Sequence, residues 1–120
     1  MVHNEVTVHE IVGEVKGRVC LLVDDLIDTG RTITKAAEAL KANGAIGVVV
    51  AATHAVFSDP ATEILQSPAI DSVVVTDTLP LPAEKRWDRL EILPIAPLIA
   101  RAIREVFDDG SVTKLFDGAA

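Results

Sequence analysis

Aromatic residues are scarce in this chain of 120 residues, which has three Phe, one Trp and no Tyr. Hydrophobic residues nevertheless make up 49% of the sequence, so a core built from Val, Ile, Leu and Ala is available. The length fits one domain. We therefore expect a single domain over residues 1–120, with a lead-in at 1–18, an α/β core at 19–107 and a tail at 108–120.

Cysteine is nearly absent as well, because Cys20 is the only one in the sequence. It cannot form an intrachain disulfide, and a single unpaired cysteine is typical of a protein in the reducing cytoplasm. No run approaches the roughly 18 to 20 apolar residues of a membrane span. The first ten residues, MVHNEVTVHE, lack the basic and hydrophobic regions of a signal peptide. These features predict a cytoplasmic protein without a membrane partner.

Positive charge is also in short supply, with 11 Lys and Arg against 18 Asp and Glu and a net charge of −7. Affinity for nucleic acid comes from clustered Lys and Arg, so we expect no nucleic-acid partner. His3 and His9 lie six residues apart, but no third ligand of suitable spacing follows them. We expect both histidines to be solvated or structural.

The most informative stretch is residues 19–35, VCLLVDDLIDTGRTITK. Its apolar run predicts a strand at 19–26 that is buried on both faces, as in a parallel sheet. A helix is expected at 32–43, with Thr32 as its N-cap and Asn43-Gly44 at its end. A loop with a glycine before a helix N-terminus favours phosphate binding, because the first helical N–H groups have no internal partners.

Two adjacent acids, Asp24 and Asp25, precede this loop at the end of the strand. Carboxylates there suit the hydroxyls of a sugar, or a magnesium ion held directly or through water. Each piece alone is ordinary turn or capping chemistry. The order of strand, acid pair, Asp-Thr-Gly-x-Thr and helix is what indicates a binding site.

The remaining core repeats the pattern of strand and helix. We expect strands at 46–52, 73–75 and 90–93, a short helix at 60–66 capped by Asp59, a Pro-containing connection at 79–86, and a helix at 94–107. The apolar residues of the last helix recur at a spacing of three and four, which predicts that this side faces the core. Successive strands joined by helices predict right-handed βαβ units and ligand binding at the carboxyl ends of the strands.

Two further residues have open interpretations. His54 follows the second strand at the same edge, where it could act as an acid–base group or substrate contact, or brace the loop by hydrogen bonding. Trp87 is isolated, which favours packing or a subunit contact over a base-stacking role.

The segment with Asp24, Asp25 and the loop 28–32 resembles the phosphoribosyl-diphosphate motif of type I phosphoribosyltransferases and ribose-phosphate diphosphokinases. The resemblance implies a three-layer α/β/α fold with a mainly parallel sheet. It also implies that ribose 5-phosphate is bound by the acid pair through the ribose hydroxyls, and by the loop through the 5′-phosphate. The residues concerned are Asp24, Asp25, Asp28, Thr29, Gly30, Arg31 and Thr32, with Asp24 and Asp25 also as candidate metal ligands.

Further segments distinguish the two families. THAVFSDPA at 53–61, VVVTDTLPLP at 73–82, LPIAPLIARAI at 93–103 and SVTKLFDG at 111–118 resemble ribose-phosphate diphosphokinase in the same order. The resemblance covers nearly the whole chain but corresponds only to the C-terminal domain of that enzyme. Its reaction transfers diphosphate from MgATP to C1 of ribose 5-phosphate, for nucleotide synthesis. It implies Mg²⁺ as cofactor, ATP and ADP as ligands of the full enzyme, and a homo-oligomer.

Two positions add detail to the resemblance. Arg31 is a departure, because the diphosphokinases commonly have Gly there. Ser111 and Thr113 match a Ser-x-Ser pair that contributes to a regulatory phosphate or ADP site between subunits.

The adenine pocket and basic catalytic loop of the family lie largely in the N-terminal domain. We therefore expect the 120-residue chain by itself to bind sugar phosphate weakly and to be inactive, and we assign no catalytic residue. The alternatives are a non-catalytic regulatory subunit and a stand-alone phosphoribosyltransferase, although no hood segment for a nucleobase is evident.

Overall fold

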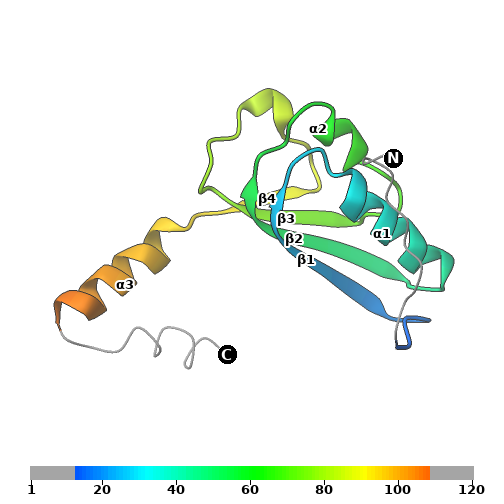
Figure 1. Cartoon of the computed structure of the whole chain (residues 1–120), viewed down its shortest axis with the longest axis horizontal. Coiled ribbons are helices and arrows are strands. Elements are labelled where there is room, and N and C mark those ends of the chain that lie inside the picture. Colours follow the sequence, from blue (N-terminus) through cyan, green and yellow to red (C-terminus); the bar gives the residue numbers. More distant parts are fainter. Residues whose placement is uncertain (1–12, 109–120) are drawn as a thin grey trace, which may run out of the picture.

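The computed structural model describes residues 13–108, which form a four-stranded parallel sheet with helices. The strands lie in the order β1-β2-β3-β4, which is also their order in the sequence (Figure 1). Their bounds are β1 Val19–Ile27, β2 Gly47–Ala55, β3 Ser72–Thr76 and β4 Leu90–Leu93. The helices are α1 Arg31–Ala42, α2 Ala61–Ile64, the 3₁₀ turn η1 Ala83–Lys85, and α3 Ala96–Phe107. The predicted α/β class and parallel sheet are confirmed.

One face of the sheet packs against α1 and α2, which lie on the same side of it (Figure 1). The side chains of Val48, Val50, Val73 and Val75 are almost completely buried there. The helices contribute small or aliphatic residues, and the loop after β2 contributes Phe57, which is fully buried. The core is therefore aliphatic, as the composition predicts. Its helical and loop members are Ile33, Ala37, Ala45, Phe57, Ala61, Leu65, Ile70 and Leu81.

The opposite face of the sheet carries no described helix. Val19, Leu21 and Val23 of β1 are 66%, 63% and 71% exposed on this face. Each strand pairs with the previous one on the same side, and right-handed crossovers in one direction place their helices on one face. The prediction that the strand at 19–26 is buried on both faces is thus wrong, because β1 lies at the edge of the sheet with one face uncovered. A third layer is not formed by the described residues.

Helix α3 ends at Phe107 as predicted, but its apolar side does not face the core. None of its residues is buried, and Ile99, Ile103 and Phe107 are 49%, 64% and 87% exposed. It extends away from the sheet after β4 (Figure 1). The periodicity correctly indicated an amphipathic helix, but it contains no information on what the apolar side contacts.

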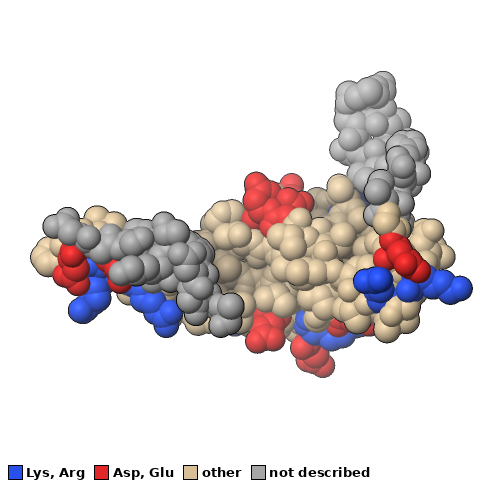
Figure 2. All heavy atoms as spheres, turned by 90° about the horizontal axis from the view of Figure 1, so that it is seen from below, with Lys and Arg blue, Asp and Glu red and all other residues tan. Residues whose placement is uncertain are grey.

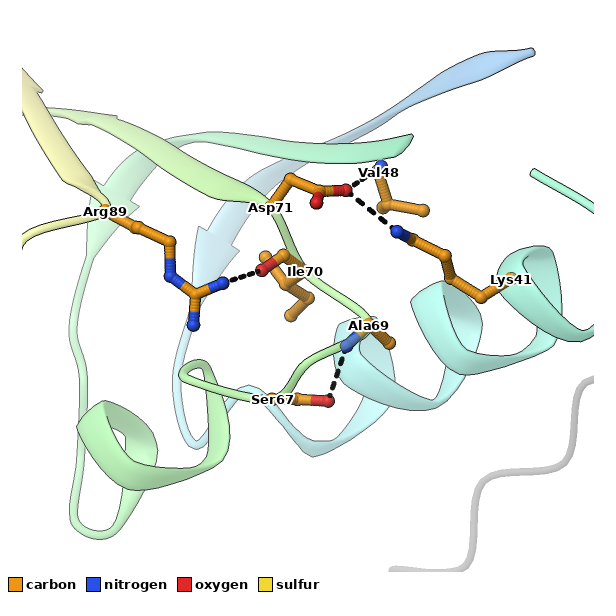
Figure 3. A network of polar contacts seen from close by, with 7 residues as sticks. All are labelled: Lys41, Val48, Ser67, Ala69, Ile70, Asp71 and Arg89. Atoms are coloured by element: carbon orange, nitrogen blue, oxygen red, sulfur yellow. Dashed lines mark hydrogen bonds and ion pairs between the residues drawn. The ribbon is translucent and has the colours of Figure 1, made fainter. Parts of the chain in front are cut away.

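The amino-terminal edge of the sheet is held by a polar network around Asp71 (Figure 3). One carboxylate oxygen of Asp71 accepts from the Val48 amide at 2.7 Å and pairs with Lys41 Nζ at 3.1 Å. Arg89 donates to the carbonyl of Ile70 at 3.1 Å. These bonds tie α1, β2 and the turn before β3 together at the edge opposite the acid pair.

Smaller differences concern element ends. The short second helix covers only Ala61–Ile64, and Asp59 makes no capping bond because Pro60 stands at the N-cap. Trp87 packs against Phe57 with ring centroids 5.9 Å apart, which confirms a packing role. None of the described helices is long and apolar enough to cross a membrane.

Candidate functional site

The acid pair and the loop meet at the carboxyl end of β1, where the chain turns into α1 (Figure 1). Gly30 makes this turn with φ 80° and ψ 4°, the left-handed region that disfavours residues with a Cβ. A Cβ built on Gly30 would lie 2.9 Å from Cγ and Cδ2 of Leu65. Leu65, directly after α2, is buried, so any residue other than Gly at position 30 would prevent this close approach of the loop to α2.

The helix α1 begins at Arg31, and its N-cap is Gly30. The predicted N-cap, Thr32, instead lies in the first turn, because the left-handed Gly30 already provides the entry into the helix. No side chain caps this end. The first bond into the helix runs from the Thr34 amide to the Gly30 carbonyl at 3.0 Å. The amides of Arg31, Thr32 and Ile33 thus have no acceptor among residues 13–108.

The residues that carry these free amides line a small hollow of about 220 Å³. Asp24 and the whole predicted loop line it, so the structure brings together most of the residues of the motif. Three of the lining residues, Leu26, Ile27 and Ile33, are aliphatic, and the sequence did not indicate that they would lie at the site. The lining residues are Asp24, Leu26, Ile27, Asp28, Thr29, Gly30, Arg31, Thr32 and Ile33.

The two acids shape the end of β1 through bonds to the backbone. Asp24 Oδ1 accepts from the Asp25 amide at 2.8 Å, and Asp25 Oδ1 accepts from the Leu26 amide at 2.9 Å. The pairing of β1 with β2 skips Asp25, passing from Asp24 to Leu26. Asp25 does not line the hollow. Of the two neighbouring acids, only Asp24 lines the hollow, and Asp25 lies beside it.

The charge of Asp25 is stabilised locally. A side-chain hydrogen bond with Asp24 and the amide of Leu26 hold the pKa of Asp25 below its ordinary value, and the His54 charge acts in the same direction. The lowered pKa extends the anionic form of Asp25, which any aspartate has at neutral pH, toward more acidic pH. A fixed carboxylate beside a sugar or a cation accepts hydrogen bonds or donates electron pairs without first losing a proton.

A magnesium ion fits this carboxylate pair only in part. Among residues 13–108 no group of three or more His, Cys, Asp or Glu side chains could hold a metal. Mg²⁺ in phosphate-transferring sites is commonly held by one or two carboxylates, with phosphate oxygens and water completing its shell. Asp24 and Asp25 suit that arrangement, in which the ligand supplies the missing oxygens.

His54 lies on the neighbouring strand β2, opposite Leu26 in the register. Its Nδ1 is 2.7 Å from Oγ1 of Thr78, which also donates to the Thr53 carbonyl at 3.3 Å. Thr76 donates to the same carbonyl at 2.7 Å. His54 does not line the hollow. Of the two interpretations of His54, these contacts favour bracing of the loop after β3.

The regulatory positions inferred from the sequence, Ser111 and Thr113, lie outside the described residues, as do His3 and His9.

Taken together, the fold and site define an α/β domain of the class that binds ligands at the carboxyl ends of parallel strands. A family model described as the phosphoribosyl synthetase-associated domain matches residues 2–117. The chain belongs to this family.

Curated relatives agree with this assignment. A ribose-phosphate pyrophosphokinase from Streptomyces avermitilis is 60% identical over 97% of the chain, and one from Corynebacterium efficiens is 55% identical over 99%. The crystal structure of a phosphoribosylpyrophosphate synthetase from Mycobacterium smegmatis superposes with a TM-score of 0.76 at 50% identity, and it covers 82% of the chain. The chain spans only 36% of each of the two curated relatives and 33% of the solved chain.

Proposed function

We propose that this chain supplies the ribose-5-phosphate-binding part of a ribose-phosphate diphosphokinase, which transfers diphosphate from MgATP to C1 of ribose 5-phosphate. The observation that carries the proposal is the uncapped N-terminus of α1, which opens into a hollow beside carboxylates. A helix N-terminus with free N–H groups and a positive dipole end favours a phosphate.

In this proposal the 5′-phosphate lies against the start of α1. The amides of Arg31, Thr32 and Ile33 donate to its oxygens, and the hydroxyls of Thr29 and Thr32 add further bonds. Arg31 is exposed and lines the hollow, so its guanidinium is available for a charge-assisted bond. The departure from Gly at this position would then add phosphate affinity.

The ribose hydroxyls face Asp24, with Asp25 beside it. Mg²⁺, held by these carboxylates and by ligand oxygens, would neutralise charge on the transferred diphosphate. Neither acid is assigned a proton transfer.

The size of the hollow limits what the chain does alone. Sites for drug-sized ligands have about 300–1,000 Å³, whereas this hollow has about 220 Å³. A sugar phosphate suits it better than a sugar phosphate together with ATP. Phosphoryl-type transfer depends on positioning and on cations around both reactants. We expect the 120-residue chain by itself to turn over negligibly, and the relatives to use further parts of their chains.

Several finer points belong to the same proposal. The assignment of the matched part to the C-terminal domain of such an enzyme is a prediction from the resemblance. The regulatory phosphate or ADP site at Ser111 and Thr113, the homo-oligomer and the cytoplasmic location are likewise predictions from the resemblance.

Chemical-shift mapping tests the proposal. Ribose 5-phosphate with Mg²⁺ should shift the amide signals of Gly30, Arg31 and Thr32, whereas ribose without phosphate should leave them unchanged. Asp71, at the opposite edge of the sheet, serves as an internal control. If ribose 5-phosphate leaves the loop amides unmoved in a folded chain, the proposal fails and the non-catalytic regulatory subunit takes its place. Turnover with a nucleobase and phosphoribosyl diphosphate would instead favour a phosphoribosyltransferase.

A further inference from the structure

Phe57, in the loop after β2, has a backbone conformation that its residue type rarely adopts. Its φ of 49° lies in the left-handed region, where a bulky residue is an outlier. Such a conformation persists only where the surrounding structure holds it in place. The ring of Phe57 is fully buried and packs against Trp87. Its backbone is held as well, by bonds on both sides.

The amide of Phe57 holds the end of β1. It donates to the carbonyl of Ile27 at 3.1 Å, and the Val56 amide donates to the same carbonyl at 3.0 Å. Ile27 is the last residue of β1 and lines the hollow at α1. Its carbonyl and the amide of Asp28 belong to one planar peptide unit. Bonds that fix this carbonyl therefore also fix the start of residues 28–32, here called the phosphate loop.

The carbonyl of Phe57 is held by Lys85, which lies far from it in the sequence. The ammonium group of Lys85 donates to this carbonyl at 2.7 Å, in a partly buried bond. Glu63 and Glu84 line a separate hollow of about 400 Å³ together with Lys85. In the described part of the chain, however, Lys85 forms no ion pair with a carboxylate. Its charge is thus directed to a backbone carbonyl, in a bond that the charge strengthens.

The backbone of Lys85 is fixed independently of its ammonium group. Lys85 is the last residue of η1, and its amide donates to the carbonyl of Pro82 at 3.0 Å. The guanidinium of Arg86 donates twice to the carbonyl of the buried Leu81, at 3.0 Å and 2.8 Å. The lysine side chain therefore extends to Phe57 from a turn that is anchored to the core.

Positive charge is scarce around the middle of the molecule. On the face shown in Figure 2, Lys and Arg are seen mainly toward the two ends, and the middle shows mostly Asp and Glu. The net charge of the chain is −7. A phosphate in the hollow at α1 would thus be held largely by backbone amides, whose bonds depend on distance and angle. Its affinity then depends on how accurately the phosphate loop is placed.

We infer that Lys85 is a positioning residue for the phosphate loop and acts through Phe57 and Ile27. Lys85 does not line the hollow at α1, so it acts through the backbone and not by contact with the ligand. The inference rests on the proposed function of the loop and assigns a role in it to a distant residue. A small displacement of the groups that hold a substrate can cost about 100-fold, so loss of the ammonium group should weaken binding.

The test compares Lys85→Met with Lys41→Met in the full 120-residue chain. Both variants remove an ammonium group and keep an unbranched apolar side chain. Lys41 pairs with Asp71 at the opposite edge of the sheet, so Lys41→Met is the control for a merely structural effect. Circular dichroism checks the fold, and NMR of the ligand-free chain records the signals of the phosphate loop. Calorimetric titration with ribose 5-phosphate and Mg²⁺ gives the affinity.

Lys85→Met should move the ¹³C signal of the Phe57 carbonyl and speed hydrogen exchange at the Phe57 amide. It should also shift the amide signals of the phosphate loop, and it should weaken binding of ribose 5-phosphate at least about tenfold. Lys41→Met should leave these signals and the affinity unchanged, because its contact lies at the other edge of the sheet.

Unmoved loop signals in a folded Lys85→Met chain would overturn the inference, and so would equal effects of the two variants. A parent chain that does not bind ribose 5-phosphate would count against the proposed function, while the ligand-free loop signals still decide the role of Lys85. If Lys85→Met does not fold, exchange of the Lys85 ammonium protons in the parent chain decides. Slower exchange than at the exposed Lys35 would support the inference, and equal exchange would overturn it.

Discussion

Replacing Gly30 by Ala should destabilise the fold through two separable effects. The first is conformational, because Gly30 has a φ of 80°, and a residue with a Cβ in the left-handed region costs roughly 1–2 kcal/mol. The second is steric, because the added Cβ would lie 2.9 Å from Cγ and Cδ2 of Leu65. Leu65 is 1% exposed, so a shift of its side chain would disturb the core residues around it. Overpacking of a core costs typically about 1–3 kcal/mol, so the sum is about 2–5 kcal/mol.

Gly17 provides a matched control for the conformational effect. Its φ of 75° is close to that of Gly30, but a Cβ built there would meet no atom within 4 Å. Gly17→Ala should therefore cost only the conformational part, roughly 1–2 kcal/mol. The difference between the two variants measures the contact of the loop with Leu65.

Urea unfolding followed by the fluorescence of Trp87, the only tryptophan in the sequence, gives both free energies of unfolding. Unfolding removes Trp87 from its contact with Phe57 and should shift its emission to longer wavelength. If Gly30→Ala loses no more stability than Gly17→Ala, the close approach of the loop to α2 is refuted, and with it the rigid shape assigned to the hollow.

Three other predictions follow from the packing and the polar network. The Val48 amide and then Lys41 lower the pKa of Asp71, so the contribution of Asp71 to stability is present above the unfolded pKa of about 3.9 and is lost as the pH falls through the lower folded pKa. Asp71→Asn should therefore reduce the fall in the free energy of unfolding at acidic pH, measured by urea titrations at several pH values; an unchanged fall would contradict this prediction. Ile70→Ala should cost about 2–5 kcal/mol, against ±0.5 kcal/mol for the exposed Ile46→Ala, in the same unfolding assay; equal losses would argue against the core described. The Ile95 amide, between β4 and α3, donates to Asp77 Oδ1 at 2.8 Å. Asp77→Ala removes this bond and should raise hydrogen exchange at the Ile95 amide relative to the unchanged Thr34 amide; unaltered exchange would show that the connection from β4 to α3 is held in another way.

The sequence contained enough information for the order and type of the elements. Alternation of apolar runs with glycine-terminated helical segments is a local signal, and the strand predicted at 90–93 coincides with β4. The motif Asp-Thr-Gly-x-Thr also located the turn into α1. Here the local residues decide the geometry, because the left-handed turn needs Gly30.

Burial could not be predicted in the same way. Val19, Leu21 and Val23 have the composition of a strand covered on both faces, yet their exposure depends on the strand order and on which face the crossover helices occupy. The apolar side of α3 poses the same problem, since apolar spacing does not identify the surface that covers it. The roles of Asp77 and Leu65 were also missed, because both act through contacts with residues distant in the sequence.

The most direct test of the proposed function is a calorimetric titration of the chain with ribose 5-phosphate and Mg²⁺. Thr29→Val with Thr32→Val removes two hydroxyls from the hollow, and Thr62→Val, whose hydroxyl bonds to the Lys85 carbonyl elsewhere, serves as the control. Hydrogen bonds to a charged group contribute about 1.5–3 kcal/mol each, so the double variant should bind at least about tenfold more weakly, while the control binds as the parent does. Equal affinity of the parent and the double variant would contradict a phosphate site at the start of α1.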